Sequence, residues 1–259
     1  MALVNKSFED LFEFSRASEA TYWDSNGVLQ IAGVDEPRFY HDPVTGEPEG
    51  ILLEREATNH IASNTEFFIS YANFTGNQES DPFLGPVMRM AAVADGEDST
   101  GFNLSLGTSY PAGNPSYGPT LRVIYAKYVN CKYVSLRTAG GPTGITVDIT
   151  TGEIVQSRGL AAEGSFVRLM ANGWCEIAWR NDTEELSGVG NMYLVLFGSE
   201  AKNVINGQGI AYVEGDEVLL AYPSWYSNGE ALSPPSIIPT SGSPVTRAED
   251  LINIPISGV

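Results

Sequence analysis

Four aromatic residues in turn-rich segments are the first candidates for binding chemistry. Trp225, Tyr226, Tyr110 and Tyr117 stand among Gly, Pro, Ser and Asn residues, which favours exposure of their rings. An exposed ring can stack on the apolar face of a sugar while Asn, Asp or Arg side chains bind its hydroxyls. These four residues are therefore the predicted glycan-binding positions, and packing at a subunit interface is the alternative.

Carboxylates are the second candidates, because glycoside hydrolysis uses a pair of them. The chain has 32 Asp and Glu residues, but no strand-like segment carries a cluster of the E-x-D-x-x-E kind. The sequence also lacks the G-x-S-x-G, Walker A and G-x-G-x-x-G motifs. We expect a protein that is not an enzyme, and a polysaccharide-degrading glycosidase is the less favoured alternative.

Two acidic segments offer closely spaced oxygen ligands of the type that Ca²⁺ prefers. They are Asp95-Gly96-Glu97-Asp98 and Glu214-Gly215-Asp216-Glu217, and neither has the spacing of an EF-hand. Solvated acidic loops are the usual explanation for such segments. We therefore expect no metal site and no cofactor, with bound Ca²⁺ as the alternative.

Cysteine and histidine do not form a recognisable ligand or catalytic pattern. Cys131 and Cys175 lie far apart without a C-x-x-C motif, and the histidines are His41 and His60. This spacing supports neither a zinc site nor a nucleophile–base pair. Free thiols are the default expectation for both cysteines, and a disulfide between them is left open.

Charge and composition restrict the class of partner. Of the 259 residues, 14 are Lys or Arg and 32 are Asp or Glu, which gives a net charge of −18. Such an acidic surface repels phosphate backbones and anionic lipids, so we expect no nucleic-acid partner and no membrane insertion. No apolar run approaches 18 residues, and the first residues carry Glu and Asp where a signal peptide needs basic and then apolar residues. We expect a soluble protein made in a cytoplasm.

The central zone, residues 57–230, predicts an all-β domain. Short runs of alternating apolar residues recur between Gly, Pro and Asn, and residues 121–129 and 132–137 are the clearest strands. Many short strands at even spacing are typical of two packed antiparallel sheets or a barrel. We therefore predict an antiparallel β-sandwich with an extended arm on each side.

The two arms are predicted to have no core of their own. Residues 1–56 form an N-terminal arm for attachment or oligomerisation, with hairpins and a short helix over 7–14, and 231–259 form a Pro-rich extended C-terminal segment. Ile237 and Ile238 would be left exposed in a solvated tail, so we expect a neighbouring subunit or particle shell to cover them.

Two arginines in these arms are candidate assembly contacts. Arg16 and Arg247 stand in arginine-poor stretches of an acidic chain, each beside Ser or Thr. A guanidinium group can bind the carboxylates or backbone carbonyls of a partner. Pairing with a local Glu is the alternative.

Several phrases together resemble modules in the structural proteins of tailed bacteriophages. They are FSRASEATY (14–22), DSNGV (24–28), PRFYHDPVTGE (37–47), GILLE (50–54), TN (58–59), NTEF (64–67), DITTG (148–152), NGW (172–174) and IPTSGSPVTRA (238–248). They follow the family's order and cover nearly the whole chain.

The resemblance implies a jelly-roll or concanavalin-like β-sandwich, similar to carbohydrate-binding modules, without catalytic residues. It also implies a virion protein that is assembled in the host cytoplasm as a homotrimer and contacts capsid or tail proteins. Because the sequence has no heptads or repeats that could build a long shaft, we expect a head fibre, a capsid decoration or a short tail-tip fibre. Such a protein could bind host surface polysaccharide, and a tail-fibre receptor-binding adhesin is the alternative.

Overall fold

The described part of the chain is built from strands. The computed structural model describes residues 7–61, 63–64, 74–97, 120–138, 144–158, 164–181, 193–201, 210–226 and 236–254. Every regular element in these ranges is a β-strand, and every strand pairing is antiparallel. The prediction of an all-β antiparallel fold is confirmed.

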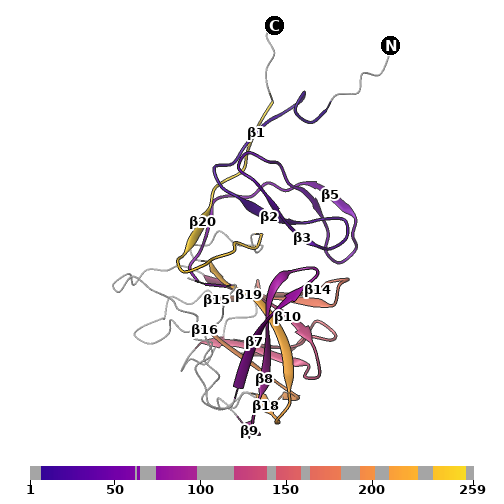
Figure 1. Cartoon of the computed structure of the whole chain (residues 1–259), viewed down its shortest axis with the longest axis vertical. Coiled ribbons are helices and arrows are strands. Elements are labelled where there is room, and N and C mark those ends of the chain that lie inside the picture. The colour runs from indigo at the N-terminus through magenta and orange to yellow at the C-terminus, as the bar shows by residue number, and fades with distance from the viewer. Residues whose placement is uncertain are drawn as a thin grey trace.

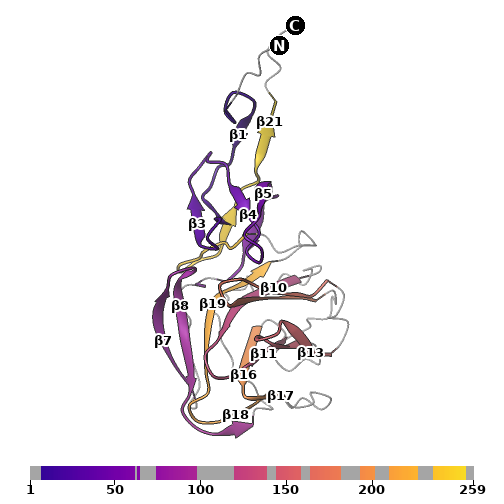
Figure 2. The ribbon, with the colours of Figure 1, turned by 90° about the vertical axis from the view of Figure 1, so that its right-hand side faces the viewer.

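Two sheets face one another in the lower half of the molecule (Figures 1 and 2). In the described residues the larger has six strands in the order β14 (Phe166–Leu169), β15 (Trp174–Asn181), β10 (Thr120–Tyr128), β19 (Glu217–Tyr226), β8 (Gly85–Ala92) and β7 (Phe74–Asp81). The smaller has four in the order β13 (Glu153–Arg158), β12 (Gly144–Asp148), β11 (Tyr133–Thr138) and β16 (Tyr193–Gly198). A small sheet of β17 (Glu200–Ala201), β18 (Ile210–Tyr212) and β9 (Gly96–Glu97) lies at the lower end.

The two flanks of the chain fold together in the upper half (Figure 2). Their paired strands are β1 (Glu13–Ser15) with β21 (Leu251–Asn253), β2 (Ala20–Trp23) with β3 (Leu29–Ala32), β4 (Phe39–His41) with β5 (Pro48–Ile51), and β6 (Ala57–Asn59) with β20 (Val245–Arg247). We call residues 7–61 and 236–254 the terminal unit.

The terminal unit corrects the expectation that the arms need another molecule to cover them. Each arm supplies strands that pair with the other arm in the same chain, as in the ladders β1–β21 and β6–β20. Strand β6 begins at Ala57, which the sequence assigned to the sandwich. The predicted short helix over 7–14 is also wrong: one turn, closed by Phe12 N–H to the Phe8 carbonyl at 2.9 Å, is followed by β1.

Apolar residues on both faces of the six-stranded sheet explain why the terminal unit must be there. In β10, Ile124 and Ala126 belong to the core between the two sheets, whereas Leu121, Val123 and Tyr125 belong to a second core on the opposite face. That second core includes residues of the terminal unit, among them Trp23, Ala57, Ile237 and Ile238. The six-stranded sheet is therefore a middle layer, and the terminal unit covers its outer face.

The tryptophans of β15 follow the same alternation. Trp174 lies in the outer core and Trp179 in the core between the sheets, and both are fully buried. Their separation by five residues predicts opposite faces of a strand, and this prediction is confirmed.

Strand β19 contains an irregularity at the contact with the terminal unit. The β10–β19 register shifts between Val123 and Tyr125, and Tyr222 adopts a φ of 44°. Two residues of β19 then oppose one of β10, as in a β-bulge. The Tyr222 hydroxyl donates to the Leu84 carbonyl at 2.9 Å, which anchors the bulge to the neighbouring chain segment.

Candidate functional site

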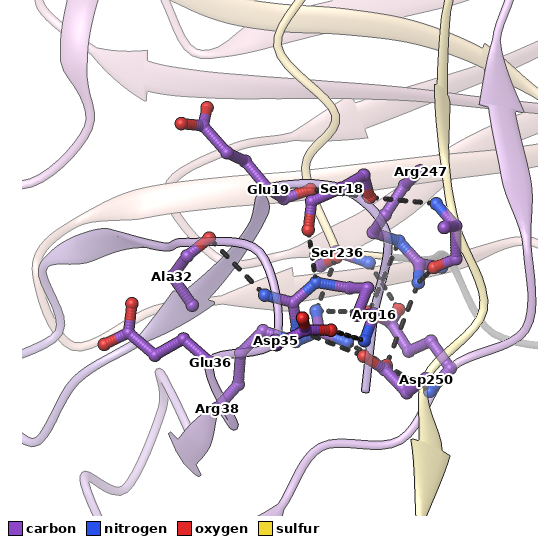
Figure 3. Close-up of polar contacts among 12 residues, drawn as sticks. Arg16, Ser18, Glu19, Ala32, Asp35, Glu36, Arg38, Ser236, Arg247 and Asp250 are labelled. Atoms are coloured by element: carbon purple, nitrogen blue, oxygen red, sulfur yellow. Dashed lines mark hydrogen bonds and ion pairs between the residues drawn. The ribbon is translucent and has the colours of Figure 1, made fainter. Parts of the chain in front are cut away.

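Four of the nine quoted phrases supply residues to one buried cluster of charged side chains (Figure 3). Arg16 follows β1, Arg38 precedes β4, Glu54 follows β5, Arg247 ends β20 and Asp250 precedes β21. We call these five residues the arginine cluster. It draws on segments from both flanks of the chain, so it exists only when the two flanks are together.

Asp250 is the centre of the cluster. Its Oδ1 accepts a hydrogen bond from Arg16 Nη1 at 3.1 Å, and its Oδ2 accepts one from Arg38 Nη2. Oδ2 also accepts the backbone N–H of Glu54 at 2.8 Å. The side chains of Asp250, Arg16 and Arg38 have no solvent-exposed area. One carboxylate thus joins two arginines of the N-terminal flank to the C-terminal flank.

Glu54 is the second carboxylate and extends the link to the segment before β20. Its Oε2 accepts Arg38 Nη1 at 2.6 Å, and its Oε1 accepts the Ser236 backbone N–H at 2.6 Å. Arg38 Nη1 also donates to the Ser236 hydroxyl at 2.9 Å. Arg247 Nε lies 3.8 Å from Glu54 Oε2.

Backbone carbonyls accept several of the other guanidinium donors. Arg16 donates from Nε to the Ser18 carbonyl at 2.7 Å and from Nη2 to the Gly33 carbonyl at 2.6 Å. Arg247 donates from Nη2 to the Arg55 carbonyl at 2.6 Å. These bonds hold loops that have no ladder of their own, because each carbonyl belongs to a turn or a connection.

The charge balance of the cluster indicates that its role is to hold the two flanks of the chain in one arrangement. Three guanidinium groups share two carboxylates, so positive charge is in excess inside the protein. Burial lowers the pKa of Arg247, Arg38 lowers it further, and Glu54 and Asp250 oppose the change. A buried ion network gains little net stability, but the loss of one member leaves uncompensated charge. The cluster therefore specifies one arrangement of the two flanks.

Side-chain amides attach the Pro-rich segment to the same unit. Asn59 Nδ2 and Asn64 Nδ2 both donate to the Ile238 carbonyl, at 3.0 and 2.9 Å. Asn59 Oδ1 accepts the Trp225 backbone N–H at 3.1 Å, so the same side chain reaches β19. The Thr21 hydroxyl donates to the Ile237 carbonyl at 2.6 Å.

These contacts correct the four predicted assembly contacts. Ile237 and Ile238 are each 3% exposed and pack in the outer core of their own chain. Arg16 and Arg247 are equally buried, and their partners include Asp250, which lies in the same chain. None of the four presents its side chain to another molecule. Residues 234–244 contain four prolines and several serines, and they show no local pattern of burial because the groups that cover the segment are distant in sequence.

The expected exposure of Trp225 and Tyr226 is also wrong. Both lie in β19 opposite β10, in the pairs Arg122–Trp225 and Leu121–Tyr226, and they are 0% and 4% exposed. The Arg122 guanidinium carbon lies 5.0 Å from the Trp225 ring centroid and 4.6 Å from that of Trp179. These rings pack inside the protein and cannot stack on a sugar. Tyr110 and Tyr117 lie outside the described residues.

The two acidic segments meet, but three of their carboxylates, those of Asp95, Asp216 and Glu217, bind protein groups. Asp95 Oδ1 accepts the Glu214 backbone N–H at 2.8 Å, and buried Asp216 accepts the Ser199 and Val213 N–H groups at 3.1 Å. Glu217 pairs with Arg89 at 2.9 Å. No group of three metal-ligating side chains occurs in the part of the chain that the structure describes. Asp98 lies outside that part.

A second buried polar group joins the terminal unit to the sandwich. Glu176 of β15 accepts the Tyr125 hydroxyl at 2.8 Å and Arg168 Nε at 2.8 Å. Arg168 Nη1 reaches the Tyr40 hydroxyl of β4 at 3.5 Å. Burial and the charge of Glu176 raise the pKa of Tyr125, so its hydroxyl remains a donor.

The expectation of free thiols is confirmed. Cys131 and Cys175 are both buried and unpaired, and burial raises the pKa of each thiol to about 12. A thiol with such a pKa is not a nucleophile at neutral pH.

Sequence reasoning missed Arg38, Glu54 and Asp250, although Arg38 and Glu54 lie within the quoted phrases. The signal that could have found them is the presence of charged residues beside apolar ones in segments that otherwise look buried. Their pairing could not be foreseen, because Arg16 and Asp250 are 234 positions apart.

Comparison of the sequence with protein-family models and with curated proteins found no match. Within the described residues there is also no helix that could span a membrane.

Proposed function

We propose that the protein is a non-enzymatic structural component of a bacteriophage virion. In this proposal the terminal unit is the mounting end and the β-sandwich projects from the particle. It is a head fibre or capsid decoration, or a short tail-tip fibre, and the family resemblance is the reason for choosing a virion.

The observation that carries the proposal is the arrangement of the two ends of the described chain. Strands β1 and β21 pair at one pole of the molecule, and β9 and β18 lie at the opposite pole (Figures 1 and 2). A module attached through the β1–β21 pole would hold the far end of its sandwich one molecular length away from the attachment point. This geometry suits display on a surface.

The location of the resembling phrases supports the same role. Six of them contribute Arg16, Arg38, Glu54, Asn59, Asn64 and Arg247 to the buried contacts of the terminal unit. Two others meet where the Asn172 amide donates to the Gly27 carbonyl at 3.0 Å, between a sandwich turn and a terminal-unit turn. Most of the phrases that carry the resemblance therefore supply residues that build the mounting end.

A jelly-roll or concanavalin-like topology is part of the proposal. The chain passes from the six-stranded to the four-stranded sheet between β10 and β11, returns between β13 and β14, and crosses again between β15 and β16. Repeated crossing of the chain between two antiparallel sheets is typical of jelly rolls and related β-sandwiches.

Assembly as a homotrimer and attachment to host polysaccharide are kept as secondary proposals. The family resemblance is the reason for expecting a trimer. The separate argument for assembly, that the arms needed cover from another molecule, is removed by the packing of the terminal unit. Glycan binding now depends on Tyr110 and Tyr117, since Trp225 and Tyr226 are buried. The receptor-binding adhesin and the glycosidase have no described residue that favours them over a display protein.

Purified particles of the phage that encodes the chain test the proposal. Peptides of this protein should be found by mass spectrometry in particles banded by density, and gold-labelled antibody should mark the particle surface. Complete absence from washed particles of a phage that expresses the gene would contradict a virion role. Label on the head or on the tail tip decides between the two locations.

A further inference from the structure

The terminal unit has exposed apolar residues that are neighbours in sequence of residues of the arginine cluster. In each of three segments, a residue of the buried arginine cluster is adjacent in sequence to an exposed apolar residue. Arg38 precedes Phe39, Glu54 follows Leu53, and Asp250 precedes Leu251. Phe39, Leu53 and Leu251 are 51%, 47% and 51% exposed. Successive side chains in extended chain point to opposite faces, so burial of the charged residues sends these apolar residues outward.

Strand register places the three exposed residues beside one another. Phe39 pairs with Ile51, and Leu53 follows two positions later on the same face. Asp250 N–H bonds to the Glu54 carbonyl at 2.9 Å, so Leu251 and Leu53 are the sequence neighbours of two hydrogen-bonded residues. We call Phe39, Ile51, Leu53 and Leu251 the apolar stripe.

The stripe ends at the pole where β1 and β21 pair (Figure 2). Phe8 packs against one end of it, with its ring centroid 5.9 Å from that of Phe39. A two-stranded ribbon such as β1–β21 has little stability of its own in water. Contiguous exposed apolar side chains next to such a ribbon are typical of a surface that another protein covers.

The charge around the stripe selects the class of partner. Every exposed charged residue in the described terminal unit is acidic except Arg55, because its other arginines are buried in the cluster. Alternation places Glu249 on the same face as Leu251 and Arg55 on the same face as Leu53, and across the described terminal unit the exposed acids outnumber this one exposed base. A second copy of this chain would bring like charges together, and like charges across an interface oppose binding.

We propose that the apolar stripe docks into a groove on a different virion protein, and that this groove is apolar in its centre and lined by Lys and Arg at its rim. The proposal rests on the proposed function, because it names the partner chemistry of the mounting end. Apolar burial supplies affinity, and the acidic rim supplies orientation and rejects self-association.

Particles produced without this gene are the probe for the test. Purified full-length chain is added to them, and bound chain is measured by co-sedimentation at increasing NaCl concentration. A Leu53→Ser/Leu251→Ser variant removes the centre of the stripe, and Val213→Ser is the matched control, since Val213 is 50% exposed beside β18 at the opposite pole. Thermal unfolding and light scattering of all three proteins verify that each is folded and report its mass.

The stripe variant should bind at least about tenfold more weakly than the control, because two leucines lose their burial. Wild-type binding should weaken as salt rises, since opposite charges are screened. Equal binding of the stripe variant and the control, or binding unaffected by salt, overturns the inference alone. A self-associated wild type that becomes monomeric in the stripe variant also overturns it, in favour of a second copy. Failure of the folded wild-type chain to bind particles overturns the proposed function and the inference together.

Discussion

At the scale of single residues, the described terminal unit buries three of its four arginines and exposes most of its acids. Arg16, Arg38 and Arg247 are 1%, 0% and 2% exposed, in a chain with a net charge of −18. A buried guanidinium group without a carboxylate is costly, so each depends on Glu54 or Asp250. The arrangement is specific because three arginines from separate segments share these two carboxylates.

Removal of the Asp250 charge should therefore destabilise the whole chain. Asp250→Asn leaves Arg16 and Arg38 without their shared carboxylate, and breaking a buried pair in this way costs about 3–5 kcal/mol. Urea denaturation should show a midpoint that is clearly lower than in the wild type. The exposed neighbour gives the control: Glu249→Gln should unfold within about 0.5 kcal/mol of the wild type. Similar midpoints for the two variants would contradict the role of Asp250.

The buried thiols predict a loss of stability in alkali. The folded state raises the pKa of Cys131 and Cys175 from 9.0 to about 12, so it favours the protonated thiol. This contribution is complete below pH 9, and it is lost as the pH rises towards 12, because the unfolded chain then releases protons that the folded chain keeps. Urea unfolding at several pH values should show that stability falls with pH in this window.

The double variant Cys131→Ala/Cys175→Ala distinguishes the effect of thiol ionisation on stability from that of the tyrosines, which ionise in the same pH range. Its stability should fall less steeply with pH than that of the wild type, whatever its absolute value. At pH 8, a disulfide reagent such as DTNB should react with the native chain only after urea is added. Rapid reaction of both native thiols would show that they are not buried.

At the scale of elements, the alternation of apolar residues could predict the sandwich but not its third layer. Residues 121–129 were correctly predicted as a strand, and Trp174 and Trp179 were correctly placed on opposite faces. Residues 121–126 of β10 are all buried. The periodicity of the sequence alone cannot show which segments cover the two faces of such a strand. Trp225 and Tyr226 were misjudged because Ser, Asn and Gly beside them resemble a loop, whereas the β10–β19 ladder continues through both.

The bulge of β19 should depend on the Tyr222 hydroxyl. Tyr222→Phe keeps the ring in the outer core but removes the donor to the Leu84 carbonyl, and such a loss costs about 1 kcal/mol or somewhat more. Thermal unfolding should register the difference. Tyr128→Phe removes a hydroxyl from a residue that is 49% exposed and should leave the transition unchanged. An unchanged transition in both variants would mean that the hydroxyl does not stabilise the bulge.

At the scale of the whole molecule, the flanks and the sandwich share one packed core. Trp23 and Ala57 pack with Tyr125 and Tyr222 in the outer core, and the His60 N–H bonds to the Trp225 carbonyl at 2.9 Å. The local sequence of the arms could not reveal this, because their partners lie in the sandwich and in the opposite flank. The quoted phrases contain Arg16, Arg38, Glu54 and Arg247 but not Asp250, and nothing in them indicates that these residues meet.

A chain that lacks residues 1–56 should therefore fail to reach the native state. The truncation removes Arg16, Arg38 and Glu54 and exposes the outer face of the six-stranded sheet, including Leu121 and Val123. Near-ultraviolet circular dichroism should lose its native signal, and light scattering should detect aggregation. A truncated chain that remained monomeric with a sharp thermal transition would show that the sandwich folds independently.

The central claim is that the two flanks complete one unit within a single protomer, and a designed disulfide tests it most directly. Thr58 and Thr246 are paired in the β6–β20 ladder, and their hydroxyl oxygens lie 2.8 Å apart. Mild oxidation of the Thr58→Cys/Thr246→Cys variant should form a cross-link within one chain, whereas neither single variant should do so. The account predicts a monomer with altered mobility on a non-reducing denaturing gel. Cross-linking mainly into dimers or larger species would show instead that the flanks pair between chains.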